Sequence, residues 1–132
     1  MLQRQFISRI IQEMSDMPNR LKKLSEEEKW EEVEKLTASF YKTYLKADGR
    51  EGRDFSVPEL LARFNQDAKA FDPLSAVFAL EAERLTKQGR TEEARKSGKQ
   101  ALTLLEYLDT QEAITFSRDR KNRITLLKKQ YE

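Results

Sequence analysis

Two tyrosines spaced for one helix face are the first residues of this chain that could bind another molecule. Tyr41 and Tyr44 lie three positions apart in a stretch of helical periodicity, and each joins an apolar ring to a hydroxyl that can remain in water. Such a pair can line the edge of a groove for a partner helix or peptide. The same spacing is also typical of residues in a core or at its edge. We treat Tyr41 and Tyr44 as candidate partner-binding residues.

The last segment of the chain is basic. Residues 113–132 contain six Lys and Arg against two acidic residues, whereas the whole chain carries a net charge of only +2. Four of the basic residues share one face of a predicted helix: Arg118, Lys121, Lys128 and Lys129. They form a candidate basic patch for nucleic acid, an acidic protein or anionic lipid. We favour the interpretation of a solvated helix face, because a pI near 8.8 is low for a nucleic-acid-binding domain.

The absence of two residue types removes the common catalytic chemistries. The sequence has no His and no Cys, so imidazole bases, Ser-His-Asp triads, thiolate nucleophiles, disulfides and the usual zinc sites are excluded. Oxygen-ligand sites for Mg²⁺ or Ca²⁺ remain formally open. We therefore expect a protein that is not an enzyme and that has no cofactor.

Helices must position these candidates. Apolar residues recur at three-and-four spacing along the 132 residues, charged residues make up 36%, and Gly and Pro number only four and three. This pattern predicts a single all-α domain of five or six antiparallel helices, arranged as stacked hairpins. No stretch is long and apolar enough for a membrane span, and the N-terminal residues do not form a secretory signal. We expect a cytoplasmic protein.

The signals for helix starts and ends divide the sequence into five segments: a first hairpin (1–47), a loop (48–55), a short helix (56–71), a second hairpin (72–108) and a basic C-terminal helix (109–132). Ser25 and Ser56 each precede a Glu by three residues, which is typical of a capping box. Asp72 with Pro73 predicts another helix start. Gly49 suits the left-handed position that ends a helix.

The second hairpin carries small and apolar residues at regular spacing: Phe78, Ala82, Leu85, Gly89, Ala94 and Ala101. Here the sequence resembles a tetratricopeptide repeat, a helical hairpin with a Trp-x₂-Leu-Gly-x₂-Tyr first helix and a small-residue second helix. The resemblance covers about a quarter of the chain. The overall layout resembles uncharacterised bacterial helical proteins of that type. It implies stacked hairpins and a scaffold or protein–protein interaction function, with no activity attached.

Three residues depart from the repeat pattern. Glu81 replaces a Leu, Gly98 replaces a Phe and Glu106 replaces a Pro. A partly buried Glu81 could bind a partner together with Arg84, or it could pair with a basic residue of the next helix. Gly98 has no turn to make in mid-helix, so we expect it to permit close packing against the other helix of the hairpin.

The sequence thus predicts a non-enzymatic interaction or scaffold module that binds another protein or peptide. A homodimer through the N-terminal helix is a further possibility. The alternative is binding of nucleic acid or an anionic surface by the basic C-terminal helix.

Overall fold

The computed structural model describes residues 2–132, with side chains from residue 5 onward, and this part of the chain contains helices and no strand. The predicted all-α class is confirmed. The elements are α1 (Leu2–Met14), α2 (Met17–Glu26), α3 (Trp30–Tyr44), α4 (Gly49–Asp54), α5 (Val57–Arg63), the 3-10 turn η1 (Ala68–Ala70), α6 (Phe71–Lys87), α7 (Thr91–Asp109) and α8 (Arg118–Tyr131). None of the described helices is both long enough and apolar enough to cross a membrane.

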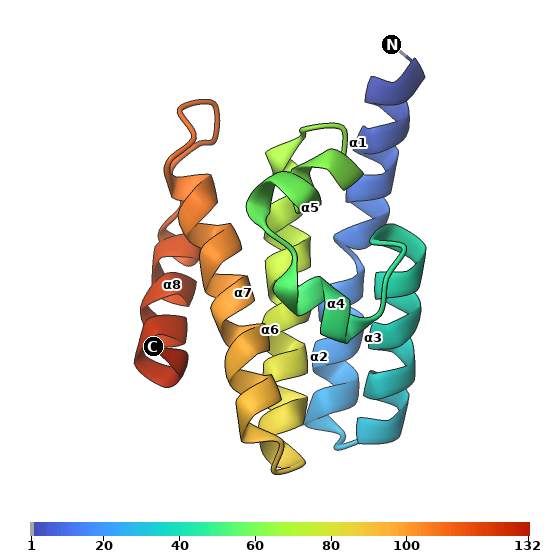
Figure 1. Ribbon diagram of the computed structural model, residues 1–132, viewed down its shortest axis with the longest axis vertical. Helices are drawn as coiled ribbons and strands as arrows, with labels where there is room; N and C mark the ends of the chain where they lie inside the picture. The colour runs from blue at the N-terminus through green and yellow to red at the C-terminus, as the bar shows by residue number, and fades with distance from the viewer. Residues whose placement is uncertain (1) are drawn as a thin grey trace.

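Helix α6 lies at the centre of the fold. It packs along α7 on one side and against α2 and α3 on the other, while α8 covers the outer side of α7 (Figure 1). Its inward residues are completely buried, among them Leu74, Phe78 and Leu85. The buried residues of α6 lie around most of its circumference, so this helix must be covered on several sides, which explains its central place.

Helices α4 and α5 form a second layer across one side of the long helices (Figure 1). The sequence predicted a loop over 48–55, and this prediction is wrong, because Asp48 and Glu51 form a capping box that starts α4. The backbone N–H of Glu51 donates to the Asp48 side chain at 2.8 Å. Gly49 therefore begins a helix instead of ending one, and Lys46 takes the left-handed conformation after α3.

Tertiary contacts hold α4 in place. The side-chain amide of Gln100, on α7, donates to the carbonyl oxygens of Gly52 at 2.9 Å and of Phe55 at 2.8 Å. Gly52 is buried, and a Cβ atom there would lie 3.3 Å from Leu45 and 3.4 Å from the Phe78 ring. The segment that the sequence presented as a flexible connection is therefore packed and anchored.

The first hairpin differs from the prediction at its turn. Pro18 lies in the first turn of α2, where the N-terminal helix is interrupted, but Ser25 is buried inside α2 and caps nothing. Leu21 and Leu24 keep α2 packed on the core up to Glu26, so the turn falls later, at Glu28 with a φ of 58°. By contrast, the Ser56–Glu59 capping box is confirmed, with hydrogen bonds of 3.2 and 2.9 Å.

Two later boundaries also move. The short helix predicted over 56–71 ends at Arg63, because Asn65 and Gln66 adopt left-handed conformations before η1. The helix predicted over 109–132 begins only at Arg118, because the Asp109 carboxylate does not cap it. That carboxylate instead pairs with Arg120 at 2.7 Å and Lys121 at 2.9 Å.

Gly98 is a close-packing position, as the sequence predicted, but its neighbour is α8 and not the other helix of the predicted hairpin. A Cβ atom at Gly98 would lie 2.8 Å from Cε2 of Tyr131 and even closer to other atoms of that ring. Real Cβ atoms do not approach an aromatic ring this closely, so the last helix docks on α7 where the side chain is missing.

Candidate functional site

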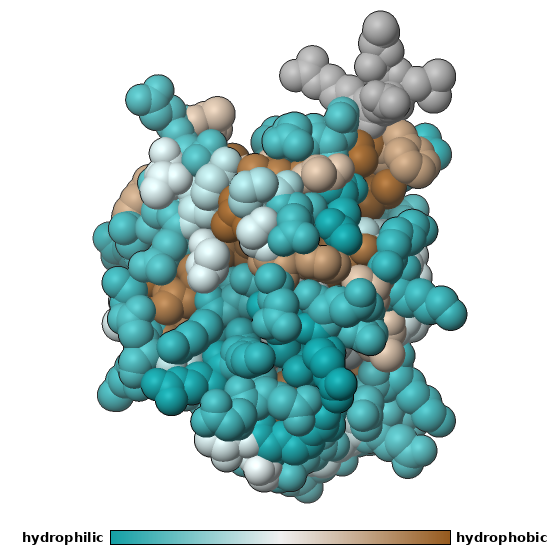
Figure 2. All heavy atoms as spheres, in the orientation of Figure 1, coloured by the Kyte–Doolittle hydropathy of each residue, from teal (hydrophilic) through white to brown (hydrophobic). Residues whose placement is uncertain are grey.

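A cleft of about 240 Å³ lies where α3, α6, α7 and the start of α4 meet. Helix α3 contributes Glu34, Thr37, Ala38 and Tyr41, whose spacing of three and four places them on one face of the helix. Four arginines line the cleft, Arg50, Arg53, Arg84 and Arg90, together with Glu81, Glu93 and Asp48. We call it the arginine cleft. The surface around α4 is strongly hydrophilic (Figure 2).

The Glu81 carboxylate is the centre of a buried network. Its Oε1 atom accepts hydrogen bonds from the Tyr41 hydroxyl at 3.2 Å and from Nε of Arg53 at 3.2 Å, and Oγ of Ser97 lies 2.9 Å away. Glu81 is only 2% exposed. A buried carboxylate is tolerated when it is paired and hydrogen-bonded, and Glu81 meets both conditions.

Arg53 connects this network to a second ion pair. Its Nη1 atom lies 3.3 Å from the Glu93 carboxylate, which also receives two hydrogen bonds from Arg90, at 2.8 and 2.6 Å. These bonds, chiefly those from Arg90, lower the pKa of Glu93 to about 2. Through Arg53 the short helix α4 is tied to both α6 and α7.

Tyr41 is fully buried, and its ring stacks on Phe78 with a centroid distance of 5.1 Å. Burial, and next the nearby Glu81 charge, raise the pKa of the Tyr41 hydroxyl well above its ordinary value of 10. The hydroxyl therefore stays protonated and acts as a donor.

Arg84 is the buried arginine of the cleft with unused hydrogen-bonding capacity, whereas Arg50 is exposed to solvent. Its side chain is 4% exposed and makes one hydrogen bond, from Nη1 to Oε1 of Gln88 at 2.9 Å. The carboxylates of Glu81 and Glu34 each lie 3.8 Å from its terminal nitrogens, too far for a hydrogen bond. Nε of Arg84 and Oγ1 of Thr37 have no partner among the described residues.

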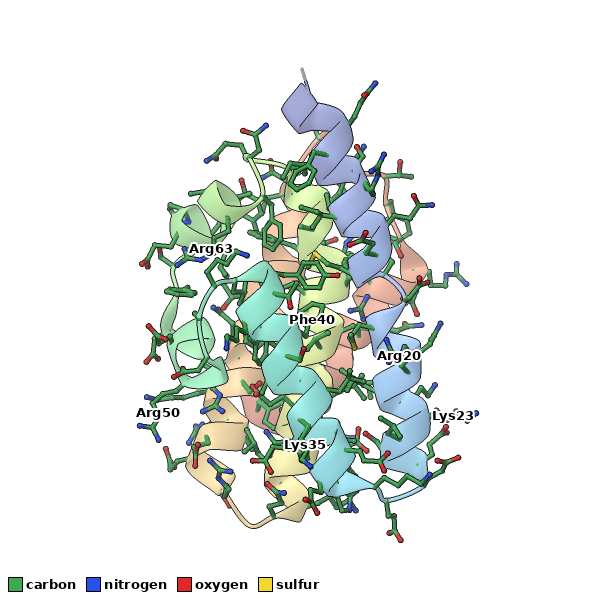
Figure 3. All side chains as sticks on the ribbon, turned by 90° about the vertical axis from the view of Figure 1, so that its right-hand side faces the viewer. Arg20, Lys23, Lys35, Phe40, Arg50 and Arg63 are labelled. Atoms are coloured by element: carbon green, nitrogen blue, oxygen red, sulfur yellow. The ribbon has the colours of Figure 1, made fainter. Side chains whose placement is uncertain are left out.

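Three of the four predicted partner-binding residues meet at this site: Tyr41, Glu81 and Arg84. Tyr44 does not, because its hydroxyl lies 3.4 Å from the Glu13 carboxylate and its ring packs on Phe40, toward α1. In Figure 3, Phe40 lies between α3 and α6, and Arg50 extends outward from α4.

The predicted basic patch is partly neutralised. Lys121 pairs with Asp109 at 2.9 Å and Lys128 with Glu106 at 3.3 Å. Arg118 and Lys129 are exposed and have no ion pair within the described part of the chain. The face therefore presents less free positive charge than its composition suggests.

The sequence interpretation missed Arg53, Ser97, Arg90 and Glu93. Arg53 lay in a segment that was predicted to be a loop, and Ser97 was hidden among the small residues of α7. The one available signal was the Asp48–Glu51 spacing, which predicts a helix start and would have placed Arg53 on a helix.

A larger cavity, of about 560 Å³, lies between α1, the turn before η1 and the α7–α8 connection. Its lining includes Ile7, Gln66 and Ile114. The charged residues there, Asp67 and Lys69, are not buried, and Asp67 is used as the N-cap of η1. We therefore place the candidate site at the arginine cleft, where buried charges converge.

The described residues contain no group of three or more acidic, His or Cys side chains placed to hold a metal ion. Comparison of the chain with known protein families, curated proteins and solved structures finds no match.

Proposed function

We propose that this protein is a non-enzymatic protein–protein interaction module that binds a partner at the arginine cleft. The observation that carries the proposal is Arg84, a buried guanidinium with one hydrogen bond at the base of a cleft. Buried charged groups are normally saturated with hydrogen bonds, so unused donors beside a cleft favour a binding role.

The arrangement of the helices is consistent with a stacked, tetratricopeptide-like module. The α2–α3 hairpin lies beside the α6–α7 hairpin, and α6 packs on both helices of the first hairpin. In repeat proteins such stacking creates extended surfaces that bind peptides. Fold alone does not give function, so the proposal depends on the cleft.

The alternative, binding of nucleic acid through α8, is weaker. Two of its four candidate residues, Lys121 and Lys128, are engaged with Asp109 and Glu106. Phosphate contacts would compete with these ion pairs, so we do not propose this function.

A pair of tryptophan substitutions tests the proposal. Ala38 is exposed and lines the cleft, whereas Ser39 is exposed on the same helix outside it. Peptides selected from a random display library on the parent protein should lose affinity by about tenfold or more with Ala38→Trp and keep it with Ser39→Trp. Circular dichroism establishes that both variants fold. If no peptide is selected, or if the selected peptides bind both variants equally, the proposal is wrong.

A further inference from the structure

The carboxylates of the arginine cleft are unevenly shared among its arginines. Arg90 holds Glu93 with two short hydrogen bonds, and Arg53 holds Glu81 and Glu93 at 3.2 and 3.3 Å. Arg84 has no carboxylate within hydrogen-bonding distance, although its side chain is as deeply buried as that of Glu81. A guanidinium has five N–H donors, so most of those of Arg84 remain available to an incoming acceptor.

Glu34 currently covers this guanidinium. Its carboxylate lies 3.8 Å from Nη1 of Arg84, and its side chain is 51% exposed at the solvent edge of α3. An ion pair that is half in water contributes little to stability, so Glu34 can swing outward at small cost. Nη1 of Arg84 is the atom that Glu34 approaches, and it uses one of its two N–H groups on Gln88, so the other can receive an incoming acceptor. Nε of Arg84 and Oγ1 of Thr37 are further unpartnered polar atoms on residues that line the cleft.

The size and charge of the cleft define what can replace Glu34. Its volume of about 240 Å³ is below the roughly 300–1,000 Å³ of sites that enclose a whole small molecule, so it suits one side chain. The acidic residues Glu81, Glu93 and Asp48 also line it. Their negative charge disfavours a dianionic phosphate more than a single carboxylate.

Resting on the proposed function, we infer that the cleft binds the carboxylate of an Asp or Glu side chain of the partner, which displaces Glu34 from Arg84. Glu34 is thus an internal competitor that occupies the place of the ligand. A matched guanidinium–carboxylate pair can form two parallel hydrogen bonds, which the 3.8 Å contact with Glu34 does not.

Nuclear magnetic resonance provides a direct test, because the Nε–H signal of Arg84 can be assigned with Arg84→Lys. Acetyl-glutamate amide should shift this signal in the intact protein, and the neutral isostere acetyl-glutamine amide should not. Glu34→Gln should strengthen binding of acetyl-glutamate amide by about two- to fivefold, because it removes a weak competitor. Glu32→Gln, at an exposed position of the same helix, should leave it unchanged.

Three results overturn the inference: equal binding of the two amides, an affinity that Glu34→Gln leaves unchanged or lowers, or tighter binding of inorganic phosphate than of acetyl-glutamate amide. The two proposals fail separately. If library peptides bind at Ala38 but are not enriched in Asp and Glu, the interaction function stands and the carboxylate inference is wrong. If acetyl-glutamate amide binds at Arg84 and no peptide does, the carboxylate site stands and the proposed function is wrong.

Discussion

Replacement of Glu81 by Gln should lower the free energy of unfolding by about 3 kcal/mol. Removal of one partner from a buried ion pair typically costs about 3–5 kcal/mol, because the other charge is left buried and unpaired. Arg53 would keep Glu93 at 3.3 Å, and Arg84 would keep the half-exposed Glu34 at 3.8 Å. These remaining carboxylates place the expected loss at the lower end of the range.

Urea unfolding, followed by circular dichroism, measures this loss. The matched control is Glu83→Gln, because Glu83 is exposed on the same helix and the same change of charge there should alter stability by less than about 0.5 kcal/mol. Both variants should show the same dependence on urea concentration as the parent.

Glu81→Leu sharpens the test, because Leu is the residue that the repeat pattern expects at this position. If the carboxylate merely fills a core position, Leu should stabilise the protein. If the carboxylate holds Arg53 by a hydrogen bond and offsets the nearby charge of Arg84, Leu should destabilise the protein at least as much as Gln does. A loss below about 1 kcal/mol with Gln, or a gain with Leu, would refute the account of the network.

Two further predictions follow from the packing. Gly98→Ala should not raise the free energy of unfolding by the usual value of about 1 kcal/mol for a helix interior, because the new Cβ meets the Tyr131 ring. In a Tyr131→Ala background the same substitution should give the full increase, as measured by urea unfolding. A full increase in the parent protein would contradict the contact. The free energy of unfolding should fall as pH rises above about 10, because Tyr41 ionises in the unfolded chain at its ordinary pKa but keeps its proton when folded. Tyr41→Phe should make this decline shallower, and an unchanged decline would argue against the raised pKa.

The fold class was accessible from the sequence because it depends on local periodicity. Capping signals were reliable where the side chain was free to cap, as at Ser56, and misleading where the side chain was buried inside a helix, as at Ser25. The arrangement of the hairpins depends on which faces meet, and a single sequence does not encode that in any spacing.

In the candidate site, too, features set by the local sequence were predictable, and features set by tertiary contacts were not. Glu81, Arg84 and Tyr41 were identifiable because each stands out on its own helix. Arg53 was not identifiable, because its role depends on its contact with Glu81, which lies 28 residues away in the sequence. Tyr44 lies apart from Tyr41 for a related reason. Residues three apart on α3 are neighbours on the helix, yet Tyr41 faces α6 and Tyr44 lies toward α1.

The ion pairs of the arginine cleft divide it into two halves with different roles. In one half, Arg53 donates hydrogen bonds to Glu81 and Glu93, Arg90 donates two more to Glu93, and these bonds fix α4 on α6 and α7. In the other half, Arg84 is held by its burial but not by a carboxylate at hydrogen-bonding distance. A donor that is already fixed in place loses little conformational entropy when a ligand binds, so the burial of Arg84 would lower the cost of binding a ligand there. The structural network and the proposed binding site are therefore parts of a single arrangement, in which Glu81 holds α4 through Arg53 and leaves Arg84 without a carboxylate at hydrogen-bonding distance.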